Sequence, residues 1–190
     1  MNKNRLEAFS DGVLAIIITI MVLELKVPHG SSLAALKPLI PVFMSYLLSF
    51  IYVGIYWNNH HHMMQMVKKV NGKVLWANLH LLFWLSLFPF ATAWMGENHY
   101  DTWPVVMYGC VMLMAATAYF ILESTLKKLH GPDSDFANTF GTSLKDTVSC
   151  LLYVIAIGGS FIRPWIGVVC YILVAIIWFI PERRVEKKIA

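Results

Sequence analysis

The sequence predicts an all-α membrane protein with six transmembrane helices in a single domain, residues 1–190. Hydrophobic residues make up 58% of the chain and charged residues only 14%, and both values depart from those of soluble domains. Uncharged stretches near the ~20 residues that a spanning helix needs also recur along the whole chain. The expected spans are residues 6–27, 38–60, 73–96, 103–127, 144–162 and 164–181.

The first expected span is unusual because it contains two carboxylates. Asp11 and Glu24 are separated by 12 uncharged residues, which form about 18 Å of helix at ~1.5 Å per residue. The hydrocarbon core of a bilayer is ~30 Å thick, so at least one carboxylate lies near its boundary and needs a protein partner or water. We therefore expect this helix to be surrounded by other helices or to line an aqueous path.

The later spans follow from where charged and helix-breaking residues fall. The second is uncharged as far as Lys68, and the third begins after Lys73. The fourth ends in a polar stretch, residues 127–145, that contains a Gly-Pro step, and Arg163 separates the fifth span from the sixth. Six tryptophans lie toward span ends, as an interfacial aromatic belt requires: Trp57, Trp76, Trp94, Trp103, Trp165 and Trp178.

Most basic residues fall on one side of this topology: Lys3, Arg5, Lys68, Lys69, Lys73, Lys127, Lys128, Lys145, Arg183, Arg184, Lys187 and Lys188. Only Lys26, Lys37 and Arg163 fall on the other side. The positive-inside rule then predicts a multi-pass protein of the cell (inner) membrane with both termini in the cytoplasm. Basic loops beside membrane helices account for the net charge of +4, and we expect no nucleic-acid partner.

One face of the first span carries bulky apolar side chains at intervals of three and four residues. Ile16, Thr19, Ile20 and Leu23 lie on this face, while Asp11 lies on its flank. Such a stripe is typical of a helix that packs against its neighbours. It also fits a ring of Ile and Leu side chains from several subunits, forming a constriction that gates by dewetting. The periodicity alone leaves both interpretations open.

The run Arg5-x-x-x-Phe9-Ser10-Asp11, at the start of the first span, resembles the RxxxFSD signature of the transmembrane protein 175 family. This family comprises the endolysosomal potassium channels of animals and their prokaryotic relatives, and the six-span layout is similar to that of the prokaryotic members. The resemblance implies a homotetramer in the lipid bilayer with the first helices lining a central pore. It further implies passive, potassium-selective conduction of K⁺ with no cofactor, no enzymatic activity and no TVGYG filter.

The resemblance also implies roles for residues of the apolar stripe. Ile16 corresponds to the narrowest point of the pore, and Ile20 and Leu23 add two apolar layers further outward. Thr19 would supply a hydroxyl layer that helps to select potassium over sodium. An isoleucine ring offers no oxygen to replace hydration water, so an ion must pass at least partly hydrated. Glu24 is expected either to concentrate cations at the outer mouth or to pair with Lys26.

The signature residues are expected to act structurally: Arg5, Phe9, Ser10 and Asp11. Three residues at the start of the third span lie at the same depth and are their expected partners: Trp76, Asn78 and His80. A carboxylate at this depth is costly unless it is hydrogen-bonded, and indole, amide or imidazole groups can bond the carboxylate of Asp11. The alternative places Asp11 in the inner vestibule, where a ring of carboxylates attracts cations.

Three consecutive histidines, His60, His61 and His62, suggest a different function. Adjacent helical residues point in different directions, unlike the i, i+4 pairs that hold a metal. We therefore expect interfacial polar residues here, no metal site and, because catalytic motifs such as GxSxG and HExxH are absent, no catalytic residues. The alternative function is a membrane transporter or metal-binding membrane enzyme that uses the His60–His62 cluster with Asp11 or Glu24.

Overall fold

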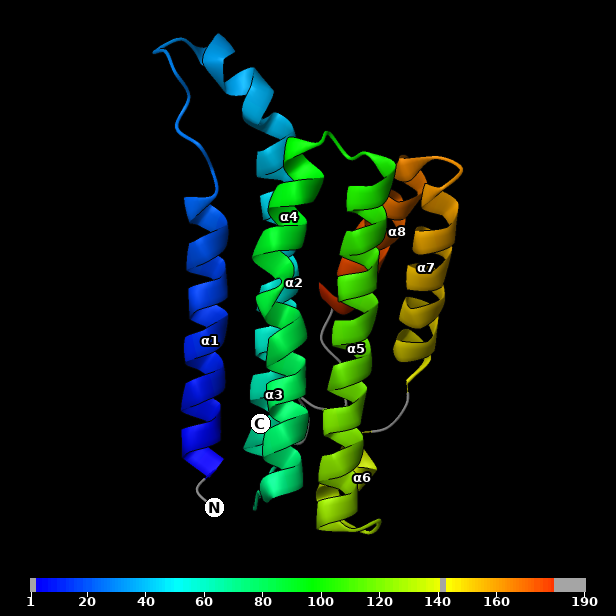
Figure 1. Ribbon diagram of the computed structural model, residues 1–190. Helices are drawn as coiled ribbons and strands as arrows, with labels where there is room; N and C mark the ends of the chain where they lie inside the picture. Colours follow the sequence, from blue (N-terminus) through cyan, green and yellow to red (C-terminus); the bar gives the residue numbers. More distant parts are fainter. Residues whose placement is uncertain (1–2, 141–142, 180–190) are drawn as a thin grey trace.

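The computed structural model describes residues 3–140 and 143–179, and every regular element within these ranges is a helix (Figure 1). The elements are α1 (Lys3–Leu23), the 3₁₀ helix η1 (Leu33–Leu39), α2 (Ile40–Gln65), α3 (Gly72–Ser86), α4 (Phe88–Glu97), α5 (Thr102–His130), α6 (Asp135–Thr139), α7 (Leu144–Ser160) and α8 (Pro164–Phe179).

Four helical segments of the described residues are long and apolar enough to cross a membrane: Lys3–Leu23, Leu33–Gln65, Gly72–Glu97 and Thr102–His130. The protein is therefore a membrane protein. Helices α7 and α8 are shorter, with 17 and 16 residues, so the count of six spans stays a prediction. The sixth expected span reaches residue 181, and residues 180 and 181 lie outside the described residues.

The segment expected as one uninterrupted span at 73–96 consists of two helices, α3 and α4, that follow each other along the bundle (Figure 1). The break falls at Leu87, two residues before Pro89. Proline lacks a backbone N–H, and its ring clashes with the carbonyl four residues earlier, here that of Leu85, so it interrupts the helical hydrogen-bond ladder.

Helix α1 lies at one edge of the bundle and packs against α2, α3 and α4, while α5 contacts α3, α4, α7 and α8 (Figure 1). The core between the helices is mainly apolar, with Val53, Phe88 and Met112 fully buried in it, and it also contains buried polar side chains such as Ser49 and Asn78. Gly96 allows the close packing of α4 on α2, because a Cβ atom at this position would lie 2.7 Å from the Cα atom of Val42.

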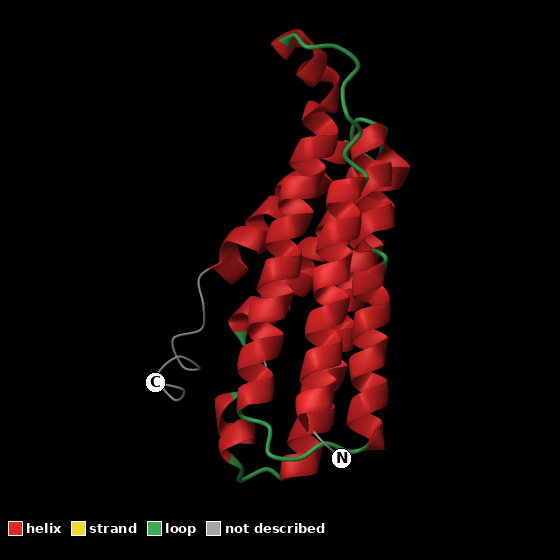
Figure 2. Cartoon of the chain, turned by 90° about the vertical axis from the view of Figure 1, so that its left-hand side faces the viewer, coloured by secondary structure: helices red, strands yellow, loops and turns green. Residues whose placement is uncertain are grey.

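The connections gather at the two ends of the bundle, as the view from the α1 side shows (Figure 2). The start of α1 lies at the same end as the α2–α3 connection: the ammonium of Lys3 donates to the carbonyl of Met64, near the end of α2, at 2.9 Å. The end of α5 reaches that connection too, since the backbone N–H of Lys68 donates to Nε2 of His130 at 3.1 Å. Basic residues of three separate segments thus share one end of the bundle, while the side of the membrane on which this end lies stays a prediction.

Candidate functional site

Helix α1 has two apolar faces with opposite environments. One face packs into the bundle through residues with at most 5% exposure: Leu6, Ser10, Leu14, Ile17 and Met21. The face expected to carry the apolar stripe is exposed in the single chain, with Ile16 at 59%, Ile20 at 42% and Leu23 at 76% exposure. The stripe therefore does not pack against helices of its own chain, and it is available to lipid or to other subunits.

The hydroxyl of Thr19 is exposed on the same side of α1 and donates to the carbonyl of Ala15 at 2.9 Å. A hydroxyl has one donor hydrogen and two acceptor lone pairs. Because the hydrogen is directed back to the helix, the oxygen presents its lone pairs outward. Thr19 thus offers an oxygen that can accept from water or contact a cation, between the apolar layers of Ile16 and Ile20.

At the other end of α1, a buried chain of hydrogen bonds ties three helices together. Ser10 is fully buried, and its Oγ accepts from Nδ2 of Asn78 on α3 at 2.9 Å. Oδ1 of Asn78 lies 2.8 Å from Nε2 of His60 on α2. Since a carbonyl oxygen only accepts, this arrangement assigns the ring hydrogen of His60 to Nε2. The structure thus brings the motif serine and Asn78 together and adds His60 to them.

Asp11 has a different partner from the expected ones. Its Oδ1 accepts from the indole Nε1 of Trp57 on α2 at 3.1 Å. Trp76 is 75% exposed, and Nε2 of His80 accepts from Trp84 at 3.0 Å. The reason is helical geometry: residues two apart are about 200° apart around the axis, so Trp76 and His80 lie on the face of α3 opposite Asn78.

The other motif residues, Arg5 and Phe9, lie on the exposed side of α1. Sequence reasoning missed Trp57 and His60 as members of the site. Their spacing of three residues on one face of α2 was the available signal, because it places an indole and an imidazole one turn apart near the charged end of α1.

Glu24 is exposed just beyond the end of α1. Lys26, its expected alternative partner, instead donates to Oε1 of Glu97 at the end of α4, 2.5 Å away. This hydrogen bond, together with the Coulomb attraction of Glu97, raises the pKa of Lys26 above its ordinary value. The ion pair connects the loop after α1 to α4 and leaves Glu24 outside it.

The three consecutive histidines are directed to different partners. His60 belongs to the buried chain, and His61 stacks on Trp57 and lies 2.8 Å from the amide nitrogen of Gln65. Nδ1 of His62 is buried without a hydrogen-bond partner among the described residues. Over the same part of the chain, no group of three or more His, Cys, Asp or Glu side chains is arranged to hold a metal ion.

Comparisons with known proteins identify the family. The family model "Endosomal/lysosomal potassium channel TMEM175" matches residues 5–89. A "Potassium channel" of Chryseobacterium sp. (strain P1-3) is 57% identical over 189 residues, which cover 100% of this chain and 98% of that protein. The chain belongs to the TMEM175 family. It is a prokaryotic-type member, and the family and these relatives are named as ion channels, not enzymes.

Two further TMEM175 relatives extend the comparison. The crystal structure of "a lysosomal potassium-selective channel TMEM175 homolog from Chamaesiphon Minutus" is similar at a TM-score of 0.78 and 28% identity, covering 93% of this chain and 95% of that one. The human "Endosomal/lysosomal proton channel TMEM175" is 30% identical over 145 residues, which are 68% of this chain and 29% of the human protein. The relatives are thus named for two different ions.

Proposed function

We propose that this chain is a potassium-selective channel that conducts passively, without a cofactor, through a central pore lined by α1. The observation that carries the proposal is the pair of faces on α1: one packs into the bundle, and a second one, on a different side of the helix, exposes Ile16, Ile20 and Leu23. The names of the bacterial relatives, one of them 57% identical over the whole chain, support potassium as the permeant ion.

The composition of the exposed face favours other subunits over lipid as its neighbours. A lipid-facing helix gains from continuous apolar cover, whereas this side also carries the hydroxyl of Thr19 and, on its flank, the carboxylate of Asp11. Polar and ionisable groups at membrane depth generally face a bundle interior or a water-filled cavity. We infer a homotetramer in which four copies of α1 face one axis, the number of subunits following from the resemblance.

In this arrangement Ile16, Ile20 and Leu23 form successive apolar rings, with the Thr19 oxygen between the first two. Ile16 and Ile20 are four residues apart, which corresponds to ~6 Å along the axis. Apolar rings that are narrow enough dewet and stop conduction, so ion flow requires that they widen. Glu24, exposed beyond the outer ring, concentrates cations at the mouth.

The proposal predicts potassium-selective flux from liposomes that contain the purified protein. Potassium, sodium and proton gradients are applied separately, and the flux is compared with that of Ile16→Asn and of a matched control, Ile155→Asn, at an exposed apolar position on α7. We expect Ile16→Asn to change permeability and to lower the preference for potassium over sodium, because an amide hydrates the ring. The control should leave both unchanged.

If Ile16→Asn leaves permeability and selectivity unchanged, the proposal that Ile16 forms the constriction is contradicted. Flux carried by protons alone would contradict potassium selectivity. No flux under any gradient would favour the alternative, a transporter or metal-binding membrane enzyme that uses His60–His62. A metal assay on the same preparation then tests that alternative.

A further inference from the structure

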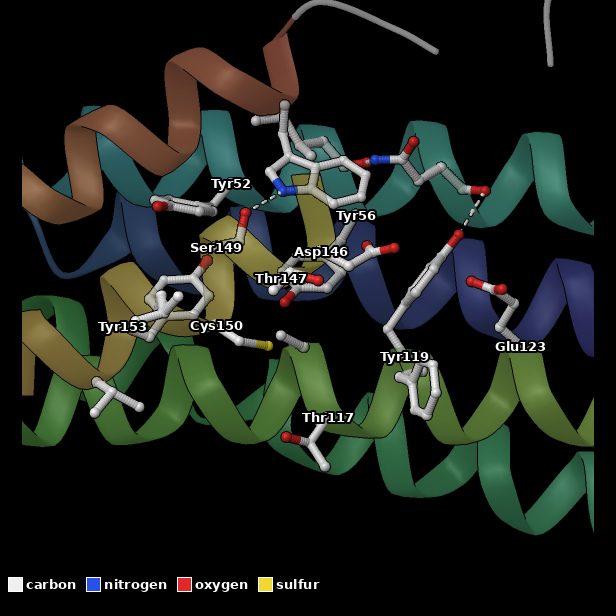
Figure 3. A pocket seen from close by; sticks show the side chains of 17 residues that line it. Tyr52, Tyr56, Thr117, Tyr119, Glu123, Asp146, Thr147, Ser149, Cys150 and Tyr153 are labelled. Atoms are coloured by element: carbon white, nitrogen blue, oxygen red, sulfur yellow. Dashed lines mark hydrogen bonds between the residues drawn. The ribbon is translucent and has the colours of Figure 1, made fainter. Parts of the chain in front are cut away.

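A cavity of about 580 Å³ lies between α2, α5, α7 and α8, away from the exposed face of α1 (Figure 3). Sites for organic ligands typically have volumes of about 300–1,000 Å³ and walls of mainly apolar and aromatic side chains. Three helices each contribute about two turns to this wall: residues 52–59 of α2, 116–123 of α5 and 146–154 of α7. Seven residues of helix are about 10 Å long, so the cavity extends along the helices over at least this length.

Polar groups of the cavity wall make their hydrogen bonds within the protein. Nε1 of Trp178 on α8 donates to Oγ of Ser149 on α7 at 2.8 Å. The hydroxyl of Tyr119 on α5 donates to the carbonyl of Asn59 on α2 at 3.2 Å, and both bonds are drawn in Figure 3. The hydroxyl of Thr117 donates to a carbonyl one turn earlier in α5 at 2.8 Å. Because these three donors are already used, a polar ligand gains little from them.

The charged groups of the wall are compensated as well. Oε1 of Glu123 lies 2.6 Å from the ammonium of Lys127. Asp146 accepts from a backbone N–H at 2.7 Å in the cap of α7. The ammonium of Lys145 lies over the ring of Trp178, 6.0 Å from its centre. Both carboxylates thus have partners and a further cation lies beside them, so the wall does not select a charged ligand.

One edge of the cavity, between α5 and α7, is formed by exposed apolar side chains. Phe120 on α5 is 47% exposed, and Leu151 and Val154 on α7 are 56% and 59% exposed. Because α5 is long and apolar enough to cross a membrane, lipid surrounds its exposed apolar face. Tyr52 and Tyr153, each 2% exposed, lie together at the other end of the cavity (Figure 3). The cavity therefore opens sideways toward lipid and is closed at its tyrosine end.

We propose that this cavity binds a hydrocarbon chain of a bilayer lipid, which enters between α5 and α7 and extends toward Tyr52 and Tyr153. Between lipid and protein in a membrane, attraction comes mainly from van der Waals packing. The wall of an empty apolar cavity lacks these contacts on one side, and a chain that lies along the helices supplies them. The headgroup stays outside, and the compensated wall does not distinguish one headgroup from another.

Photochemical labelling from the lipid tests the proposal. The full chain is reconstituted into phosphatidylcholine vesicles in which a minor fraction of the lipid carries a diazirine near the end of one acyl chain. After illumination, mass spectrometry of peptides locates the label. Tyr52 and Tyr153 are out of reach of lipid on the outer surface, so label on them reports a chain inside the cavity. Ile176 on α8, 57% exposed, serves as the outer-surface reference, and we expect label at both places.

Two neighbouring positions of α7 provide a matched pair of variants. Val154 lines the cavity at its open edge, whereas Ile155, 48% exposed, lies outside it. Val154→Trp should block the entrance and abolish the label on the tyrosines, and Ile155→Trp should keep it. Circular dichroism and gel filtration establish that both are folded, and Leu151→Trp, at the same edge, takes the place of Val154→Trp if that variant does not fold.

Phosphatidylglycerol with the same diazirine chain tests whether the headgroup matters. We expect it to label the tyrosines as strongly as phosphatidylcholine does. Three results would overturn the proposal: label on the outer surface of the unmodified chain but none on the tyrosines, tyrosine label that persists in the blocked variant, or tyrosine label from only one of the two headgroups.

Discussion

Replacing Ser10 with alanine is expected to destabilise the folded chain by about 1–1.7 kcal/mol. Ser10 is fully buried, and its Oγ accepts from Asn78 Nδ2 at 2.9 Å. In the variant this buried amide N–H loses its acceptor, and a buried donor without a partner costs ~1–3 kcal/mol. Hydrogen bonds between membrane helices are worth ~0.6 kcal/mol on average and up to ~1.7, so the expected cost lies where the two ranges overlap.

The matched control is Ser86→Ala on α3. Ser86 is exposed, and its Oγ donates only to the nearby carbonyl of Phe83 at 2.7 Å. Both variants gain the same small increment in helix propensity, because alanine is the better helix former. The difference between them therefore isolates the bond between helices, and the control should change stability by less than ~0.5 kcal/mol.

Reversible unfolding in detergent micelles, followed by circular dichroism, measures the free energy of unfolding of both variants. A double-mutant cycle of Ser10→Ala with Asn78→Leu should give a coupling energy of at least ~0.5 kcal/mol, as contacting residues do. Equal stability of Ser10→Ala and Ser86→Ala, or a coupling energy of zero, would refute the reasoning that this network holds α1 to α3.

Three further predictions concern other parts of the chain. Asp11→Ala removes the acceptor of the α2 indole and is expected to abolish the proposed homotetramer, as measured by light scattering; a tetramer that persists with lower conductance would indicate the vestibule role instead. Gly96→Ala is expected to lower the free energy of unfolding by about 1–3 kcal/mol, because the new Cβ atom would lie 2.7 Å from the backbone of α2. At Gly158 a Cβ atom would have no neighbouring atom within 4 Å, so Gly158→Ala should be neutral or stabilising by up to ~1 kcal/mol. Equal unfolding free energies of these two would argue against the close packing. Glu97→Gln should return the pKa of Lys26 toward its ordinary value, because Glu97 raises it, and an unshifted NMR titration of the lysine would contradict this.

The class of the protein could be predicted from the sequence because it depends on local properties. Long uncharged segments specify helices in a lipid environment wherever they pack. The break at Leu87 is local as well, since Pro89 is visible in the sequence. The spacing of Ile16, Ile20 and Leu23 places them on one face of α1 without reference to any other helix.

Only the tertiary structure decided what each face of a helix contacts. Depth along the bundle follows from position in the sequence, so Asn78 could be matched to the motif, but depth does not specify rotation about the helix axis. Rotation follows from packing between helices, and it placed Trp57 against Asp11 and left Trp76 exposed. The cavity between α2, α5, α7 and α8 is likewise a product of packing, because its walls come from segments that are distant in the sequence. The sequence by itself thus determined the class of the protein, an all-helical protein of the membrane, because this depends on local properties, and the packing of the side chains determined which residues meet.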